Sequence, residues 1–217
     1  MRRARGDGHE PPSSRRDGDT ARSSAGRTLR PATHHDRSHR HRPITLGVGL
    51  GDDQEYTAFG EELRHRGSRL DDSLEVLRTM LSGQAVVHRG RHLRVDAPPM
   101  RPVPLQSPIP IWIAGGWPNP RPFERARRFD GVIPRSLDPA NNGFVAASEL
   151  RAIRATIGRT DGFDYAACGT TTSADDVAHV EELRAAGATW WVESLHPWES
   201  LDAMNARLRN GPPRLAG

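Results

Sequence analysis

The sequence predicts an α/β fold built around a parallel β-sheet. Short apolar runs alternate with amphipathic segments along residues 43–217, at spacings that suit β–α–β crossovers. The clearest unit is residues 110–134, PIWIAGGWPNPRPFERARRFDGVIP, which contains a buried strand, two glycines, a short helix and a second buried strand. Five such strand–helix units are present. A closed barrel needs eight, and an open doubly wound sheet about five or six, so the pattern alone allows both.

The N-terminal region differs in composition from the rest of the chain. Residues 1–42 contain 11 Arg and 5 His against 5 acidic residues, a charge of +6, so residues 43–217 carry −2 of the net +4. Met1 and Leu29 are the only large apolar side chains among the 42. Such a segment buries too little apolar surface to offset its ordering entropy. The sequence therefore predicts a disordered tail, residues 1–42, and one folded domain, residues 43–217.

The basic tail limits the possible partners. An Arg-rich arm can bind nucleic acid, but this one has no aromatic residue to stack on bases, so a solvated tail is the favoured interpretation. Residues 34–41 are rich in His but lack the spacing of a defined zinc site. No apolar run is long enough to span a membrane. The single cysteine, Cys168, excludes an internal disulfide and suits the cytoplasm.

The sequence of the first part of the folded domain predicts a strand, two helices and a β-hairpin. The strand covers residues 44–49, a loop 50–55 and a short helix 57–66. A longer helix follows, with Ser68 and Asp71 as a capping box, leucines on one face, and Gly83 at its end. Residues 85–87 and 92–95 flank a turn and predict a β-hairpin, and a proline-rich connection, 97–110, leads into the central unit.

The C-terminal part continues the alternation of strands and helices. A second capping box, Ser173 and Asp176, and a closing Gly187 delimit one of its helices. In order, the expected elements are strand 131–133, helix 144–157, strand 164–168, a helix before residue 187, strand 189–193 and helix 198–209.

Residues that follow the strands are the candidates for chemistry. Gly115 and Gly116 leave the backbone open to close approach, and the first-turn amides of the helix at 117–120 have no intrahelical partners. A glycine pair between a strand and a helix start is a common phosphate-binding arrangement. A Gly-Gly pair alone is weak evidence, because most such pairs are turns.

One titratable pair follows a strand. Glu193 and His196 are candidate catalytic residues, with His196 relaying a proton and Trp198 lining a substrate site. The competing interpretation, which we favour, is that both residues cap or bridge the next helix. The acids at 52, 53 and 55 are more typical of helix-start charges than of a metal site. Cys168 lies in an apolar strand and is expected to be a buried hydrophobe. No metal site is predicted.

Several motifs together resemble the luciferase-like flavin-dependent monooxygenase and oxidoreductase family. They are LGVGLG at 46–51, HRGRHLRV at 88–95, PIPIWIAGG at 108–116, FDGVIP at 129–134, FDYAACGTT at 163–171, GATWWVES at 187–194 and GPPR at 211–214. The order and spacing of these motifs make the resemblance specific over nearly all of residues 43–217. The resemblance implies a TIM (β/α)8 barrel that is incomplete, with about five βα units.

The resemblance also implies a cofactor and its site. The expected cofactor is FMN or the deazaflavin coenzyme F420. The family's phosphate site falls on Gly115, Gly116, Trp117 and Asn119, and the strand end beside the flavin on Gly49, Leu50 and Gly51. Some relatives carry a phosphate-pairing Arg where this chain has Leu50, which leaves the choice between the two cofactors open.

The start of the chain departs from the family pattern. Members of the family have three strand–helix units before the one that begins near Ile44, and this chain has its Arg-rich segment there. We therefore expect an N-terminally truncated form whose sheet edges favour self-association. Three functions follow: a flavin- or deazaflavin-dependent oxidoreductase of the monooxygenase type acting on a small organic substrate, a non-catalytic barrel remnant, and a nucleic-acid-associated protein acting through residues 1–42.

Overall fold

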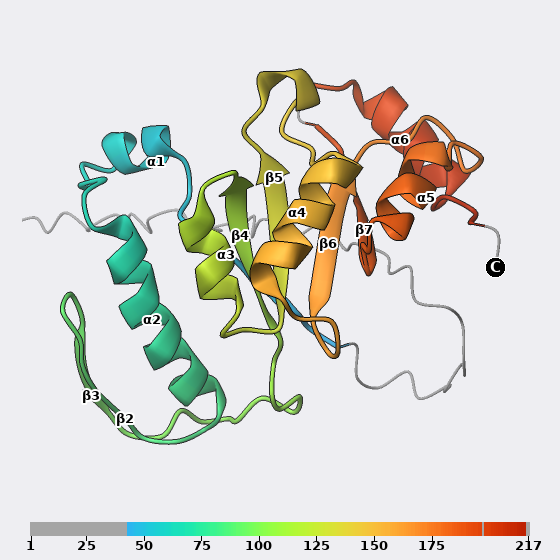
Figure 1. Ribbon diagram of the computed structural model, residues 1–217. Coiled ribbons are helices and arrows are strands. Elements are labelled where there is room, and N and C mark those ends of the chain that lie inside the picture. Colours follow the sequence, from blue (N-terminus) through green and yellow to red (C-terminus); the bar gives the residue numbers. More distant parts are fainter. Residues whose placement is uncertain (1–42, 197, 216–217) are drawn as a thin grey trace, which may run out of the picture.

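A five-stranded parallel sheet forms the centre of the computed structural model, which describes residues 43–196 and 198–215 (Figure 1). The strand order is β1-β4-β5-β6-β7, and every neighbouring pair is parallel. The strands are β1 (Leu46–Val48), β4 (Ile111–Trp117), β5 (Gly131–Ser136), β6 (Asp164–Gly169) and β7 (Trp190–Glu193). The predicted α/β class and parallel sheet are confirmed. The predicted disordered tail, residues 1–42, lies outside the described residues.

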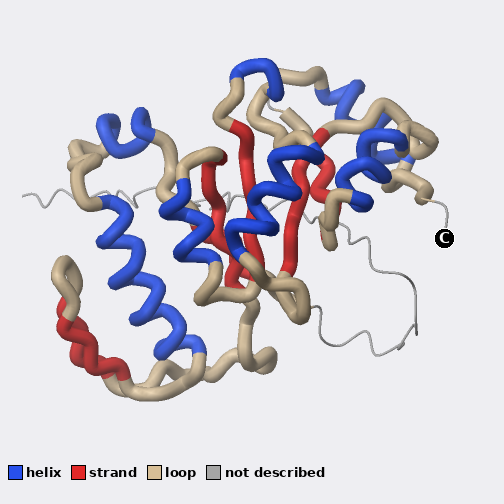
Figure 2. Tube along the Cα trace, viewed as in Figure 1, coloured by secondary structure: helices blue, strands red, loops and turns tan. Residues whose placement is uncertain are grey.

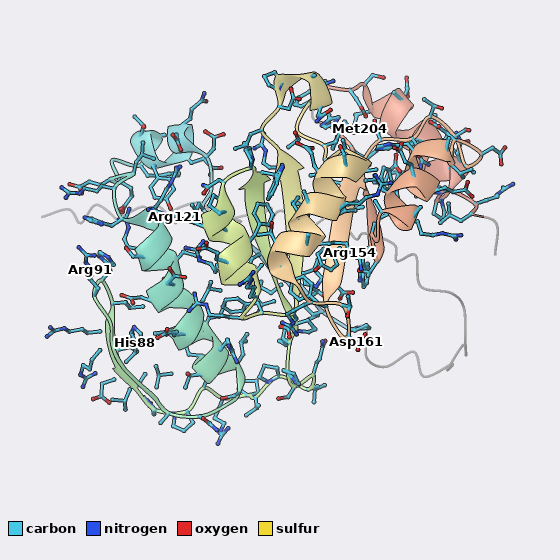
Figure 3. The ribbon with its side chains drawn as sticks, viewed as in Figure 1. His88, Arg91, Arg121, Arg154, Asp161 and Met204 are labelled. Atoms are coloured by element: carbon cyan, nitrogen blue, oxygen red, sulfur yellow. The ribbon has the colours of Figure 1, made fainter. Side chains whose placement is uncertain are left out.

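Helices connect the strands, and a hairpin interrupts the alternation once. The helices are α1 (Asp53–Ala58), α2 (Arg66–Leu81), α3 (Pro120–Ala126), α4 (Ala147–Ile157), α5 (Ala178–Ala185) and α6 (Leu201–Asn210), with a 3-10 turn, η1 (Pro139–Asn141). The predicted hairpin is confirmed as β2 (Val86–Arg89) and β3 (Arg94–Ala97), which pair antiparallel. It lies beside α2, with His88 between the two (Figure 3), and the Nε2 atom of His88 is 3.7 Å from a carboxylate oxygen of Asp72 in α2.

The order of the strands decides between the two architectures that the sequence allowed. Apart from the hairpin, each strand is followed in the sheet by the next one along the chain, with no reversal. A doubly wound sheet reverses its order and is covered by helices on both faces. Here α3 and α4 lie against the same face of the sheet, as Figure 2 shows. The described part of the chain is therefore a curled half-barrel, as expected for an incomplete luciferase-like TIM barrel.

The hydrophobic core lies between the sheet and its helices. Ile113 and Val132 of the strands and Phe123, Leu150 and Ile153 of the helices are all fully buried. The apolar residues of α4 recur every three or four positions, which gives this helix one apolar face. This face packs on the sheet, and within residues 43–196 and 198–215 no helix layer covers the opposite face of the sheet.

Both predicted capping boxes are wrong, because their acids bind partners elsewhere. Helix α2 begins at Arg66, and Asp71 is held by the guanidinium groups of Arg125 and Arg128. Helix α5 begins at Ala178, and Asp176 accepts hydrogen bonds from the backbone and hydroxyl of Thr172. A capping box was instead missed at α1, whose N-cap is Asp52. The predicted helix 57–66 is wrong over most of its length, because α1 ends at Ala58 and residues 59–65 are not helical.

The predicted helix-ending glycines are confirmed, but the predicted end of the central strand is not. Gly83 and Gly187 follow helix ends with φ of +71° and +101°, as predicted. The prediction that Gly115 and Gly116 lie between the strand and the helix is wrong, because β4 continues through both glycines to Trp117 and pairs with β5 there. The helix after it begins only at Pro120.

Candidate functional site

The packing of α3 and α4 defines which strand residues face outward. A Cβ placed on Gly115 would lie 2.3 Å from the Cβ of Pro122 in α3. Ser136 of β5 donates a hydrogen bond of 2.8 Å from its hydroxyl to Glu149 of α4. Since side chains alternate along a strand, the residues between these point to the opposite face of the sheet.

This opposite face, which we call the inner face, carries a distinctive set of residues. The five strands, together with the residue that follows β1 by one position, present Gly47, Gly49, Trp112, Ala114, Gly116, Ile133, Arg135, Cys168 and Trp190. The rings of Trp112 and Trp190 meet edge to face with centroids 5.0 Å apart. Their strands are separated by two others, about 14 Å in a flat sheet. The contact therefore shows that the sheet curls around this face.

Glycines give β1 a nearly bare wall on the inner face. A Cβ on Gly47 would lie 3.2 Å from the Cδ1 atom of Ile133, and one on Gly49 would lie 3.1 Å from the Cβ of Ala114. Both glycines are exposed. The pairing of β1 with β4 ends at Ile113, so the next residues of β4 have no strand partner on that side. The structure thus brings Gly49 next to the end of β4, where the sequence places the second part of the cofactor site.

The two glycines of β4 have different neighbours. Gly116 faces inward, and a Cβ there would meet the side chain of Leu137 at 2.7 Å. Leu137 is 53% exposed, so its side chain can move aside. Gly115 faces outward against Pro122. Trp117 also faces outward and packs edge to face on Phe123, with ring centroids 5.5 Å apart.

The start of α3 offers no spare backbone donor. Pro120 and Pro122 have no N–H, and the Arg121 amide donates to the Asn119 side chain at 3.3 Å. The Asn119 amide in turn donates to the Gly116 carbonyl at 3.0 Å. A phosphate bound here would have to displace Asn119 from its capping position. The predicted cradle of unpaired first-turn amides is therefore absent from α3 as described.

The loop after β1 places a carboxylate beside Gly51. This glycine has φ of +75°, and a Cβ on it would lie 3.0 Å from an oxygen of Glu55. The same Glu55 oxygen accepts the backbone N–H of Asp52 and completes the cap of α1. Leu50, between the two loop glycines, is half-buried. A negative group at Gly51 disfavours a phosphate at this end of the site.

Glu193 is tied into the protein by both carboxylate oxygens. One oxygen accepts hydrogen bonds from the Thr171 backbone at 2.6 Å and from the Arg207 guanidinium at 3.1 Å. The other accepts from the indole of Trp191 at 2.8 Å and lies 3.0 Å from a second Arg207 nitrogen. These contacts join the ends of β6 and β7 to α6. Glu193 thus holds three elements together, which agrees with the bridging interpretation.

His196 lies apart from this network. Its ring stacks on Trp198 with centroids 4.4 Å apart and an interplanar angle of 7°, and Phe144 lies 6.0 Å away. Among the described residues, no hydrogen bond joins His196 to Glu193. The two candidate catalytic residues are therefore near in sequence but do not form an acid–base couple, and the catalytic assignment of either stays a prediction.

Arg135 belongs to residues 134–136, a strand end that the sequence places among the candidate positions for chemistry, but no role was predicted for it. It faces inward at the end of β5, is exposed, and is the register partner of Gly116 in β4. No ion pair or hydrogen bond of its guanidinium is found within residues 43–196 and 198–215. The available signal was a cation directly after the apolar run FDGVIP.

Three further observations limit the chemistry that this face can carry out. Cys168 is half-buried rather than fully buried, and its partial burial raises the pKa of the thiol, so it is protonated at neutral pH. The indole N–H groups of Trp112 and Trp190 are enclosed and have no acceptor within the described residues. Nor do these residues include a cluster of metal-ligating side chains.

A cavity of about 430 Å³ lies elsewhere, on the outside of the sheet. Its walls come from α2 and from the segment after α3, including Glu75, Arg78 and Phe129. Neither set of predicted cofactor residues lines it. In the described part of the chain, no helix is both long and apolar enough to cross a membrane.

The sequence matches a known family and several proteins. Residues 44–212 match the family described as luciferase-like monooxygenase. Uncharacterized proteins of Mycobacterium bovis and Mycobacterium tuberculosis are each 29% identical over 122 residues, or 56% of this chain and 41% of theirs. The chain thus spans about two fifths of the length of these relatives.

Two solved structures share the fold. Monooxygenase RslO1 from Streptomyces bottropensis has a TM-score of 0.57 and 16% identity, covering 76% of this chain and 66% of that one. The coenzyme F420 dependent tetrahydromethanopterin reductase from Methanopyrus kandleri has a TM-score of 0.59 and 14% identity, covering 78% and 73%. At these identities the likeness establishes the fold.

Proposed function

Because this chain belongs to the luciferase-like monooxygenase family, we propose that it is a flavin- or deazaflavin-dependent oxidoreductase of that class. The cofactor we propose is FMN or coenzyme F420, since one structural neighbour is by name a monooxygenase and the other an F420-dependent reductase. The observation that carries the proposal is the glycine-lined inner face at the carboxyl ends of the strands, where barrel enzymes place their chemistry.

The residues of the inner face fit such a cofactor. Gly47 of β1 and Gly49 just after it are exposed and carry no side chain, so a planar ring system can approach the backbone there, with Ile133 and Ala114 as the nearest side chains. Trp112 and Trp190 add aromatic surface to the same face, at the amino ends of β4 and β7. Their enclosed N–H groups lack acceptors, which a ligand or water could supply. When bound, the cofactor would supply hydride or oxygen chemistry.

The protein's part in this proposal is to bind, orient and exclude water. Gly116 allows close approach to the backbone at the end of β4, and the exposed Leu137 beside it can cover a ligand. Glu193 positions the ends of β6 and β7 through Thr171 and Arg207. His196, ringed by Phe144 and Trp198, is the candidate for moving a proton to or from a substrate.

A matched pair of glycine variants tests the cofactor site. Gly116→Ala and Gly116→Asp both push Leu137 aside, but only Asp adds a negative charge beside the proposed phosphate position. We expect purified Gly116→Asp to bind FMN or F420 at least about tenfold more weakly than Gly116→Ala, because like charges repel. Fluorescence quenching and thermal shift measure the binding.

The same titrations separate the alternative functions. A folded wild-type chain that binds neither FMN nor F420 would contradict the oxidoreductase proposal and favour a non-catalytic remnant. Equal affinities of the Gly116→Ala and Gly116→Asp variants for the cofactor would show that its phosphate does not bind beside Gly116. Binding to DNA that collapses with salt and disappears on deletion of residues 1–42 would favour the nucleic-acid alternative.

A further inference from the structure

Arg135 is placed where a phosphate of the proposed cofactor would need a cation. It is the register partner of Gly116, the inward-facing glycine at the end of β4. Its neighbours in the strand, Pro134 and Ser136, are buried on the outer side, whereas Arg135 is exposed on the inner face. The strand therefore presents one charged side chain at the carboxyl-end mouth of the half-barrel.

The acids close to Arg135 in sequence are engaged with other partners. Glu149 accepts the Ser136 hydroxyl, an Asn141 side-chain N–H and the Ala146 amide. Asp138 caps the 3-10 turn η1 by accepting the Ala140 amide at 2.9 Å. An exposed guanidinium without a carboxylate partner keeps all five of its N–H donors for an anion.

The position of the guanidinium is set by the loop after β5. A Cβ on Gly143 would lie 3.5 Å from an Arg135 terminal nitrogen, so the side chain rests against this loop. The loop is fixed to the strand, because the Ser136 amide donates to the Gly143 carbonyl at 3.2 Å. The Arg135 guanidinium thus rests at the loop after β5, while its backbone lies opposite Gly116 in the adjoining strand.

The charges at the two glycine segments favour the Arg135 end for an anion. The Glu55 carboxylate stands beside Gly51, and the first turn of α3 has no spare N–H to offer. Of the two segments, Gly116 has a cation beside it in the adjoining strand and Gly51 has an anion. A phosphate is attracted to the first and repelled by the second.

We propose that Arg135 binds the phosphate of the cofactor, supplying from β5 the positive charge that this chain lacks at Leu50. The inference rests on the proposed cofactor class, because FMN and F420 both carry a phosphate on the side chain of their ring system. Bidentate guanidinium–phosphate contacts combine charge with geometry, and lysine reproduces only the charge.

The test compares ligands that differ by the phosphate. Wild-type protein, Arg135→Gln, Arg135→Lys and the control Arg151→Gln are titrated with FMN and with riboflavin, and with F420 and its deazaflavin chromophore lacking the phosphate-bearing chain. Arg151 is an exposed arginine of α4, so Arg151→Gln removes the same charge at a position away from the inner face. Quenching of ligand fluorescence gives each dissociation constant, and circular dichroism checks the fold.

We expect Arg135→Gln to weaken binding of the phosphate-bearing ligand by at least about tenfold, because it removes a charge-assisted hydrogen bond to the phosphate. Affinity for riboflavin or the bare deazaflavin should stay within about twofold, Arg135→Lys should recover part of the loss, and Arg151→Gln should behave like wild type. The cofactor, FMN or F420, that Arg135→Gln binds more weakly while its phosphate-free counterpart is unaffected is the one whose phosphate Arg135 contacts.

Two results would overturn the inference and are distinguishable. If wild-type protein binds a phosphate-bearing cofactor and Arg135→Gln binds it equally well, or loses riboflavin in the same proportion, Arg135 is not the phosphate partner although the proposed function stands. If wild-type protein binds none of the four ligands, the proposed function and the inference both fail.

Discussion

Glu193 illustrates how a single residue can be located from sequence while its role is not. Its place at the end of a strand was predictable from the apolar run before it. Its partners were not, because Thr171 and Arg207 are 22 and 14 residues away and come together only in the folded chain. Neither partner follows a local pattern that sequence spacing can reveal. The structure makes Glu193 a bridge between strand ends and α6.

Removing the charge of Glu193 should lower the stability of the protein. Arg207 is 12% exposed at its side chain, so Glu193→Gln leaves a nearly buried guanidinium without its carboxylate. We expect a loss of about 1–3 kcal/mol in the free energy of unfolding, measured by urea denaturation. Glu199→Gln, in the turn before α6, serves as the control. An unchanged unfolding midpoint for Glu193→Gln would argue that the bridge adds nothing to stability.

Asp71 should make stability depend on pH in the acid range. Hydrogen bonding by the Arg125 side chain lowers the pKa of this carboxyl below its ordinary value of 3.8, with the charges of Arg125 and Arg128 acting in the same direction. The folded pKa is the lower one, so the stabilisation is complete above about 3.8 and is lost as pH falls through the folded pKa. Asp71→Asn should flatten this acid loss.

Thermal unfolding between pH 5 and pH 2 measures the effect of Asp71. Asp161→Asn, at the exposed turn labelled in Figure 3, provides a control that removes a carboxylate without an arginine partner. If Asp71→Asn loses stability between pH 5 and pH 2 in the same way as Asp161→Asn and wild type, the ion pair of Asp71 with Arg125 does not cause the loss of stability in acid.

At the scale of elements, the sequence located strands better than helix starts. All five parallel strands were expected, because a run such as residues 111–114 is apolar throughout and its burial follows from composition. The capping boxes failed at Asp71 and Asp176. Such boxes depend on local competition for an acid, and Asp71 is taken by an arginine 54 residues later in the chain. A tertiary partner thus overrides the pattern at Asp71, whereas Asp176 is held by the nearby Thr172 and the capping box at Asp52 is itself a local pattern that was missed.

The packing at the end of β4 predicts losses of stability of different size when two adjacent glycines are replaced by alanine. Gly115→Ala forces a Cβ to within 2.3 Å of Pro122, a rigid ring in the buried face of α3. Gly116→Ala meets only the exposed Leu137. We expect Gly115→Ala to lower the free energy of unfolding by about 1–3 kcal/mol and Gly116→Ala to cost much less. Chemical denaturation of the pair measures this, and equal losses would contradict the described packing.

At the scale of the whole molecule, the sheet ends in strands that have one neighbour each. Strands β1 and β7 are its two edges among the described residues. Exposed large apolar side chains accompany them, with Ile44 and Phe59 near β1 and Trp198, Leu201 and Leu208 after β7. Open strand edges with apolar surroundings are typical sites of association with another chain.

We expect the purified chain to self-associate reversibly as its concentration rises. Trp198→Ser combined with Leu201→Ser should weaken the association, because these side chains are 78% and 76% exposed beside the β7 edge. Leu105→Ser, on the proline-rich connection, removes an equally exposed leucine away from β7 and should have little effect. Sedimentation equilibrium measures the change, and a monomer at every concentration would refute the expectation.

The fold class and strand order were open to prediction, whereas the site was predictable only in part. Periodicity gave the number of units, and the resemblance gave the barrel. The sequence pointed to Gly49 and Gly116, which the structure brings to the inner face, but it grouped them with Gly115 and Trp117, which face outward. Whether a strand residue points in or out depends on which face the helices cover, and this is a property of the assembled sheet.

The edge-to-face indole pair gives the protein an optical probe in its concave surface. Trp112 and Trp190 lie on the inner face, whereas Trp117 and Trp191 face the helices and Trp198 is exposed. Replacing the last three by Phe would leave an emission signal from the pair alone. Isoalloxazines and deazaflavins absorb where tryptophan emits, so a ring held against β1 would receive excitation energy from the pair. The chain would then report occupancy of the half-barrel through its own fluorescence, without an added label.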